Sequence, residues 1–266
     1  MFTPLVPTNS AHKYRLNEMT IPRFSIITVC FNALDVLPAT LASLRNQTFK
    51  DYEWVVIDGA SSDGSTAWLA EQSPDVLVSE RDKGIYDAMN KAVARANGER
   101  LFFLNAGDRF ADDGVLNDVV AALEATGKPI DCVYGDVVYF GTQGQRRKRF
   151  HWLTPGRLVF GDLCHQAAFV RRELFQKIGN FDINLRFNAD FDWFMRLFRS
   201  HPKLHYMHRD IALFHDAGAH VLAREASEKE RNAVRARYVR RPLWLAGHWA
   251  LRVELKARRL LGQEIG

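Results

Sequence analysis

Acidic side chains stand at two places in the sequence where they could take part in group transfer. Asp108 closes the short run from Asn105, whose small residues Ala106 and Gly107 would let a bulky anion approach the backbone. A carboxylate there can hold Mg²⁺ or Mn²⁺, which prefer oxygen ligands and bridge well to diphosphate oxygens. The alternative is that Asp108 caps a turn near Asp112. On these residues alone, a metal site and a structural role both remain open.

The second place is the pair Asp190 and Asp192, at the start of a run with aromatic residues at helical spacing. Acids in a first turn often only stabilise a helix through its dipole. A carboxylate within hydrogen-bond reach of a hydroxyl can also take its proton as that hydroxyl attacks. The two acids face differently on a helix, so either one could be the relevant base.

Several common nucleotide motifs are absent. The stretch 31–33 lacks the G-x-G-x-x-G pattern, which argues against a dinucleotide-dependent oxidoreductase. The loop 59–66 has the glycine spacing of a phosphate loop but places Ser65 where that loop needs lysine, and Asp63 adds negative charge, so we reject an ATPase. The three cysteines are far apart and form no C-x-x-C pair, which indicates neither a disulfide framework nor a zinc ribbon.

The elements that must position these acids follow from hydrophobic periodicity. Short apolar runs predict strands at 24–30, 53–57, 76–79 and 101–104. Helical spacing predicts helices at 34–44, just after residue 64, at 85–96 and at 115–123. This alternation is typical of a mainly parallel, doubly wound α/β sheet with helices on both faces. Ligands of such sheets bind at the carboxyl ends of the strands, where Asp58 and Asp108 lie.

After about residue 128 the pattern changes to strands and turns. We expect strands at 132–140 and 167–170, then helices at 172–178 and over the aromatic run that begins at Asp190. The chain therefore divides into an N-terminal arm (1–22), a catalytic domain (23–223) and a basic helical tail (224–266). Within the catalytic domain, we expect a nucleotide-binding half at about 23–128 and an acceptor half at about 129–223.

The charge is concentrated in the tail. Residues 224–266 hold eleven Lys or Arg and five Asp or Glu, whereas the whole chain has a formal net charge of +5. With Trp244 and Trp249, this tail could lie on an anionic membrane surface, or it could be a helix packed on the catalytic domain that shields the acceptor groove. No recognition module for nucleic acid is present, so we expect no nucleic-acid partner. We expect no signal peptide and no membrane span.

Five runs occur in an order that resembles the glycosyltransferase family 2 catalytic domain with the GT-A fold, over about residues 24–220. They are SIITVCFN at 25–32, VIDGASSDGS at 56–65, SERDKGIYDAMNK at 79–91, LNAGD at 104–108 and NADFDW at 188–193. The third run is most similar to the branch that builds bacterial exopolysaccharides such as colanic acid.

The resemblance implies a role for each matching residue. Thr28 and Asp58 would line the base and ribose pocket, and Asp82 and Lys83 would contact the nucleotide. Asn105 lies in the acidic metal motif, with Asp108 as the metal ligand. Asp190 would be the general base, with Asp192 as the alternative. His165 and Gln166 would lie near the acceptor or the diphosphate. Apart from the resemblance, His215 and His220 flank the short run 216–219 and could touch the diphosphate.

Together these features predict an inverting glycosyltransferase that depends on Mn²⁺ or Mg²⁺. Its donor would be a nucleoside diphosphate sugar, with a UDP-sugar as the first choice, and its acceptor a saccharide or a lipid-linked saccharide. We expect it in the cytoplasm, at the inner face of the cell membrane if the tail binds lipid. The metal motif contains a single carboxylate, and this motivates an alternative function: a catalytically silent nucleotide-sugar-binding or scaffold protein of a polysaccharide assembly complex.

Overall fold

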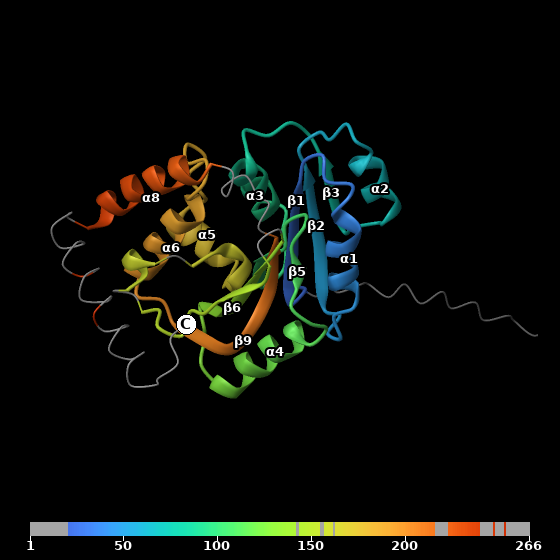
Figure 1. Ribbon diagram of the computed structural model, residues 1–266. Helices are drawn as coiled ribbons and strands as arrows, with labels where there is room; N and C mark the ends of the chain where they lie inside the picture. Colours follow the sequence, from blue (N-terminus) through green and yellow to red (C-terminus); the bar gives the residue numbers. More distant parts are fainter. Residues whose placement is uncertain are drawn as a thin grey trace, which may run out of the picture.

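The computed structural model describes residues 21–141, 144–154, 157–161, 163–215 and 223–239, together with 247 and 253. Its first half alternates strands and helices, as the sequence predicts. The elements are β1 (Phe24–Cys30), α1 (Leu37–Arg45), β2 (Tyr52–Asp58), α2 (Ser65–Glu71), β3 (Val76–Ser79), α3 (Ile85–Val93), β4 (Arg100–Phe103), β5 (Arg109–Phe110) and α4 (Val115–Thr126). Figure 1 shows α1 and α2 on one side of β1–β3, and α3 on the other.

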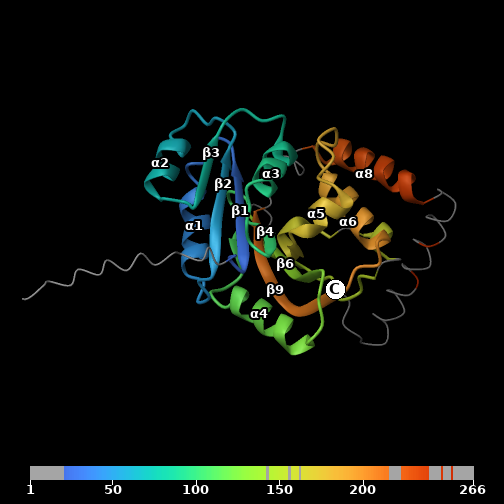
Figure 2. The ribbon, with the colours of Figure 1, turned by 180° about the vertical axis from the view of Figure 1, so that it is seen from behind.

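The second half completes the sheet and adds a layer of helices. Its strands are β6 (Cys132–Phe140), β7 (Arg146–Lys148), β8 (Ala168–Arg171) and β9 (Leu204–His215). Its helices are α5 (Glu173–Ile178), α6 (Ala189–Arg199) and α8 (Arg224–Tyr238), with single 3₁₀ turns at Leu158–Phe160 and His165–Ala167. Figure 2, seen from behind, shows α8 beside α6 as Figure 1 does.

The sheet order explains how distant residues meet. The strands run β3-β2-β1-β4-β8-β6-β9-β5, with β7 paired to β6. The first four are parallel, so the loops after β1, β2 and β4 leave the same edge of the sheet. Because β8 is antiparallel to β4, the residues just before β8 lie at the edge where β4 ends. The 3₁₀ turn His165–Ala167 is thereby placed beside the loop that follows β4.

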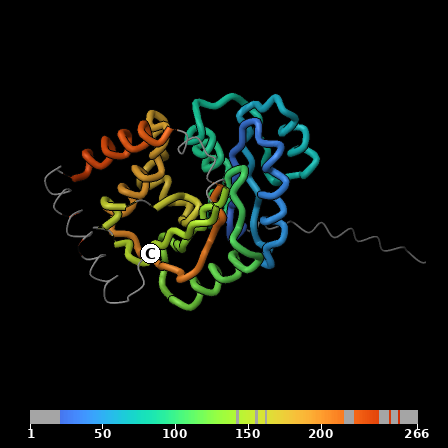
Figure 3. The backbone as a smooth tube through the Cα atoms, in the orientation of Figure 1, coloured from blue at the N-terminus to red at the C-terminus, as the bar shows by residue number. Residues whose placement is uncertain are grey.

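Burial accounts for the strength of the sequence signal in the first half. All seven residues of β1 are buried, as are six of the seven in β2, because helices cover both faces of the parallel strands. The chain also approaches itself closely at Gly98, where a Cβ would lie 2.5 Å from the backbone nitrogen of Ser25. Only glycine fits at that crossing between α3 and β4. The tube in Figure 3 follows this path from the N-terminal strands to the C-terminal helix.

The structure changes several predicted boundaries. The helix expected at 85–96 ends at Val93, and the one expected at 34–44 begins at Leu37. The two-residue strand β5 is too short to leave a periodic pattern, and the sequence did not predict it. The mainly parallel α/β class is confirmed, and the second half adds antiparallel pairs to it.

The basic tail divides at the limit of the described residues. Its first part is the helix α8, as expected, and α8 packs on α6, which is the packed-helix alternative for this part of the tail. Almost all of 240–266, and residues 1–20 of the arm, lie outside the described residues. Among the helices that the structure describes, none has both the length and the apolar character that crossing a bilayer requires.

Candidate active site

A cavity of about 360 Å³ lies where β4 ends and β8 begins, and most of the predicted site residues line it. The loop after β4 contributes Asn105 and Asp108, the turn before β8 contributes His165 and Gln166, and the start of α6 contributes Asp190. The wall is completed from β6, β9, α3 and α8, chiefly by Tyr139, Phe214, His215, Tyr86, Ser227 and Arg231.

Asp190 is held from three directions. Its Oδ2 lies 2.9 Å from Nδ1 of His165, and its Oδ1 accepts the hydroxyl of Tyr86 at 3.0 Å and the backbone N–H of Phe191 at 2.8 Å. Nε2 of His165 lies 2.9 Å from the side-chain nitrogen of Asn105. If that amide donates to Nε2, the ring proton of His165 is on Nδ1 and is donated to Asp190. The hydrogen bonds fix the orientation of the carboxylate.

These contacts keep Asp190 ionised. Burial alone would raise the pKa of Asp190, but the hydrogen bond from His165 and those from the Phe191 N–H and Tyr86 lower that pKa below its usual value. Burial, together with the charge of Asp190, raises the pKa of Tyr86, so its phenol remains a donor. Asp190 is therefore a carboxylate at neutral pH, the form that a general base needs.

Asp108 differs in its environment. It is 4% exposed. Burial raises the pKa of Asp108 to about 6, although the Gln166 amide, at 3.0 Å, and the backbone N–H of His215, at 3.2 Å, both donate to it. The two donors are too few to replace the water that Asp108 loses on burial. A positive charge close by would therefore favour the ionised form of Asp108.

The donor set beside Asp108 fits a hard divalent cation. Oδ1 of Asn105 and Oε1 of Gln166 are buried side-chain oxygens with no hydrogen-bond partner. Carboxylate and amide oxygens are the ligands that Mg²⁺ and Mn²⁺ prefer. Within the described part of the chain, no group of three or more His, Cys, Asp or Glu side chains could hold a metal alone. A cation at Asp108 would therefore need further ligands from a diphosphate and water.

Thr28 and Asp58, which we expected to contact the nucleotide, instead make buried hydrogen bonds within the protein. Thr28 is fully buried within β1, donates to the carbonyl of Leu104 at 2.9 Å and accepts from the indole of Trp54 at 3.0 Å. The expectation that Thr28 lines a ligand pocket is therefore wrong, because its side chain has no accessible surface.

Asp58 is likewise fully buried at the end of β2. Its carboxylate accepts from the hydroxyls of Ser61, Thr66 and Ser79. Burial would raise the pKa of Asp58, but these hydrogen bonds lower it. The carboxylate shapes the loop after β2 and has no surface for direct contact with a nucleotide, which corrects the expectation from the sequence.

Asp82 and Lys83 lie in the loop that leads into α3, and both remain predicted nucleotide contacts. Asp82 is half-buried and caps that loop by accepting the backbone N–H of Gly84 at 2.8 Å, and Lys83 is exposed. A Cβ at Gly59 would lie 2.7 Å from Oδ2 of Asp82. Because Gly59 has no side chain, the Asp82 carboxylate can occupy the space beside residue 59.

Asp192, the alternative base, is also corrected by the structure. It is buried, its Oδ2 accepts from Arg196 at 3.0 Å, and its Oδ1 accepts from Arg237 at 3.2 Å and from the hydroxyl of Tyr238 at 2.9 Å. Asp192 does not line the cavity, because it faces α8. This contact joins α6 to α8.

Some lining residues could not be identified from the sequence. Tyr86 lies within the conspicuous run at 79–91, but its long-range bond to Asp190 has no local signature. Ser227 and Arg231 lie in the segment that we predicted to be a tail. His215 lines the cavity and contacts Asp108 through its backbone, whereas His220 lies outside the described residues.

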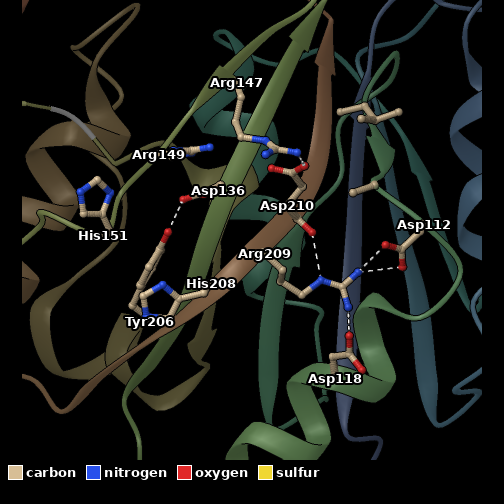
Figure 4. Close-up of a pocket in the computed structure, with 12 residues that line it drawn as sticks. Asp112, Asp118, Asp136, Arg147, Arg149, His151, Tyr206, His208, Arg209 and Asp210 are labelled. Carbon is tan, nitrogen blue, oxygen red and sulfur yellow. Dashed lines mark hydrogen bonds and ion pairs between the residues drawn. The ribbon is translucent and has the colours of Figure 1, made fainter. Parts of the chain in front are cut away.

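A second cavity, of about 850 Å³, lies between β6, β9 and the loop before α4 (Figure 4). Its charged side chains are largely paired with each other. Arg209 binds Asp112 and Asp118, and Arg147 lies 2.6 Å from Asp210. None of the residues predicted for chemistry lines this cavity, so the smaller one is the candidate active site.

The fold, with Asp108 beside buried amide oxygens and the ionised Asp190 in the same cavity, is consistent with the class of GT-A glycosyltransferases. Residues 25–215 match the model of Glycosyl transferase family 2, and the chain belongs to that family. The PGL/p-HBAD biosynthesis glycosyltransferase of Mycobacterium tuberculosis is 38% identical over 211 residues, which cover 75% of this chain and 79% of the relative.

Solved structures share the fold. Staphylococcus aureus TarS 1-349 in complex with UDP-GlcNAc aligns with a TM-score of 0.66 and 18% identity, over 80% of this chain and 65% of that one. A crystal structure of a longer TarS chain is covered to 36% of its length. The mannosyltransferase PcManGT from Pyrobaculum calidifontis, in complex with GDP-Man and Mn²⁺, aligns with a TM-score of 0.62 and 20% identity, over 92% and 77%.

Proposed function

We propose that this glycosyltransferase moves a sugar from a nucleoside diphosphate sugar to the hydroxyl of a saccharide or lipid-linked saccharide, with inversion at the anomeric carbon. The observation that carries the proposal is that Asp190, ionised and held by His165 and Tyr86, shares one cavity with Asp108. The cavity contains a base for an acceptor hydroxyl and an oxygen-rich site for a diphosphate-bound cation.

In the proposed reaction, the acceptor hydroxyl loses its proton to Asp190 while its oxygen forms a bond to the anomeric carbon. The bond between that carbon and the diphosphate oxygen breaks, and the nucleoside diphosphate leaves with the electron pair. A single displacement at one face inverts the configuration, by analogy with the carboxylate roles in glycoside hydrolysis. His165 bonds to one oxygen of Asp190 and Tyr86 to the other, and together they would hold the carboxylate in the orientation that receives the proton.

Asp108, with the amide oxygens of Asn105 and Gln166 close by, would hold Mn²⁺ or Mg²⁺. Such an ion neutralises the charge that develops on a departing diphosphate. The neighbour crystallised with GDP-Man and Mn²⁺ supports this assignment for the cofactor.

The donor and acceptor classes are part of the proposal. TarS bound to UDP-GlcNAc and PcManGT bound to GDP-Man support a nucleotide-sugar donor, with UDP-sugars tested first. For the pathway, we keep bacterial surface polysaccharide synthesis, of which the colanic-acid branch is one form. A role like the PGL/p-HBAD biosynthesis in the names of the mycobacterial relatives is the alternative. We place the protein in the cytoplasm, where residues beyond α8 could contact the membrane face.

The test is a pair of measurements on the wild type and Asp190→Asn. A thermal-shift panel of UDP, GDP, TDP and CDP with and without Mn²⁺ identifies the nucleotide, because a ligand that binds only the native state raises the melting temperature. Transfer from that nucleotide's sugars is then measured. An enzyme should lose transfer in Asp190→Asn and keep the nucleotide shift. A wild type that binds the nucleotide but transfers none of its sugars would support the silent binding or scaffold protein.

A further inference from the structure

Glu230 of helix α8 accepts hydrogen bonds from the backbone segment that precedes Asp190. Oε1 of Glu230 accepts the backbone N–H groups of Phe187 and Asn188, both at 2.8 Å, and Oε2 accepts that of Arg186 at 2.8 Å. Three consecutive backbone donors thus bind one carboxylate from a helix more than forty residues away. Such charge-assisted bonds are about twice as strong as neutral ones.

These donors lie just before α6 and at its N-cap, Asn188, whose own side chain makes no cap hydrogen bond. The first backbone N–H groups of any helix lack partners within it, and a carboxylate there is favoured by the helix dipole. Glu230 places a carboxylate at this end of α6 from outside the helix, where it accepts the N–H of the N-cap residue Asn188. Asp190 follows two residues after the last of the three bonded groups.

The side chain of Asn188 adds a second set of contacts with α8. Asn188 is 1% exposed, and its amide nitrogen donates to the carbonyl of Ser227 at 2.9 Å. Its amide oxygen accepts from Nε of Arg231 at 2.9 Å. Asn188 therefore has a fixed orientation that depends on α8, on the side of α6 that faces the cavity.

The third contact is one turn further on, where Arg237 and Tyr238 bind Asp192. α8 therefore holds α6 on both sides of Asp190. We propose that Glu230 is a positioning residue for the general base: it fixes the backbone of 186–188 so that the Asp190 carboxylate points at the acceptor hydroxyl. This inference rests on the proposed function of Asp190 as the base.

The expected effect is on turnover. A displacement of a reacting group by about 1 Å can lower the rate by about 100-fold. In Glu230→Gln, one oxygen still accepts, but the new NH₂ opposes a backbone N–H, so we expect kcat to fall by about 10-fold. Glu230→Ala removes all three bonds, and we expect a fall of about 100-fold. Glu230 itself does not line the cavity, although the residues it holds, 186–188, do, so we expect kcat to fall by a larger factor than the donor KM changes.

The matched control is Glu228→Gln, which removes an exposed carboxylate from the same helix. Initial rates of nucleotide release from UDP-glucose, UDP-GlcNAc and GDP-mannose in Mn²⁺, with water as the attacking hydroxyl, give kcat and KM for each variant. A melting curve shows that each variant is folded. Hydrogen exchange at the amides of 186–190 reports the local geometry without substrate. We expect faster exchange and lower kcat in both Glu230 variants, and neither change in the control.

The outcomes separate the two proposals. If Glu230→Ala is folded and retains wild-type kcat, or loses only melting temperature, the positioning role is refuted and the proposed function stands. If the wild type releases no nucleotide from any donor while Asp190→Asn binds nucleotide like the wild type, the proposed function fails, and the positioning of a base fails with it.

Discussion

The buried carboxyl of Asp108 should cost the protein stability in the absence of a cation, and the replacement Asp108→Asn tests this. Burial raises the pKa of Asp108 from its usual 3.8 to about 6. Each pKa unit corresponds to about 1.4 kcal/mol, so ionised Asp108 lowers the free energy of unfolding by up to about 3 kcal/mol at pH 8. At 4% exposure, solvent screens little of this effect.

The neutral amide should remove that cost without losing its contacts. The oxygen of an asparagine at 108 can accept the backbone N–H of His215, and its NH₂ can donate to Oε1 of Gln166 once the Gln166 amide turns over. Oε1 of Gln166 has no partner when residue 108 is aspartate. We therefore expect Asp108→Asn to unfold with a free energy up to about 3 kcal/mol higher than the wild type at pH 8.

The sign of the pH dependence follows from the direction of the shift. Below the unfolded pKa both states carry the proton, so the variant and the wild type should be equally stable. As pH rises from about 4 to about 6, the unfolded state ionises first and the wild type loses stability, so the difference grows and then stays constant. Urea unfolding in EDTA at pH 4 and pH 8 measures it, and adding Mn²⁺ should stabilise only the wild type. A variant that is less stable at pH 8, or a difference independent of pH, would refute this reasoning.

Three further changes have separate outcomes. Tyr86→Phe removes a hydrogen bond that lowers the pKa of Asp190, so a kcat–pH profile should lose activity on acidification at a higher pH than the wild type. Gly98→Ala places a Cβ 2.5 Å from the backbone of Ser25, and urea unfolding should show a loss of more than about 2 kcal/mol. Asp192→Asn removes the buried carboxylate that pairs with both Arg196 and Arg237, so unfolding should show a loss of about 2 kcal/mol while calorimetry shows unchanged nucleotide binding.

The first half of the fold could be predicted because its signals are local. The buried strands β1 and β2 appear as continuous apolar runs, and the amphipathic face of α3 appears at helical spacing. The cavity brings together Asn105 and Asp108, which the sequence places at a strand end, with His165, Gln166 and Asp190, which the family resemblance places near them. A sheet edge collects such residues whatever their separation in sequence.

The rest could not be predicted because it depends on distant partners. Thr28, Asp58 and Asp192 have the residue types of a binding site, but their polar atoms are saturated by Trp54, Ser79 and Arg237, and only the folded chain shows this. Conversely, α8 has the charge pattern of a surface helix. That pattern does not show which of its charged side chains bind other parts of the protein. Whether a polar group is free is a property of tertiary contacts.

The hydrogen bonds and ion pairs between α8 and α6 affect the order in which parts of the site form while the chain is synthesised. Domains generally fold as they leave the ribosome, N-terminal part first, and the strands and helices from β1 to α4 are made long before Glu230 and Arg237. Until those residues emerge, the segment carrying Asp190 lacks its outer supports. A nascent or truncated chain that ends before α8 should therefore contain the loops of the proposed nucleotide site while Asp190, the proposed base, is not yet held in place. Under the proposed function, catalytic competence would then arise only after α8 has been made.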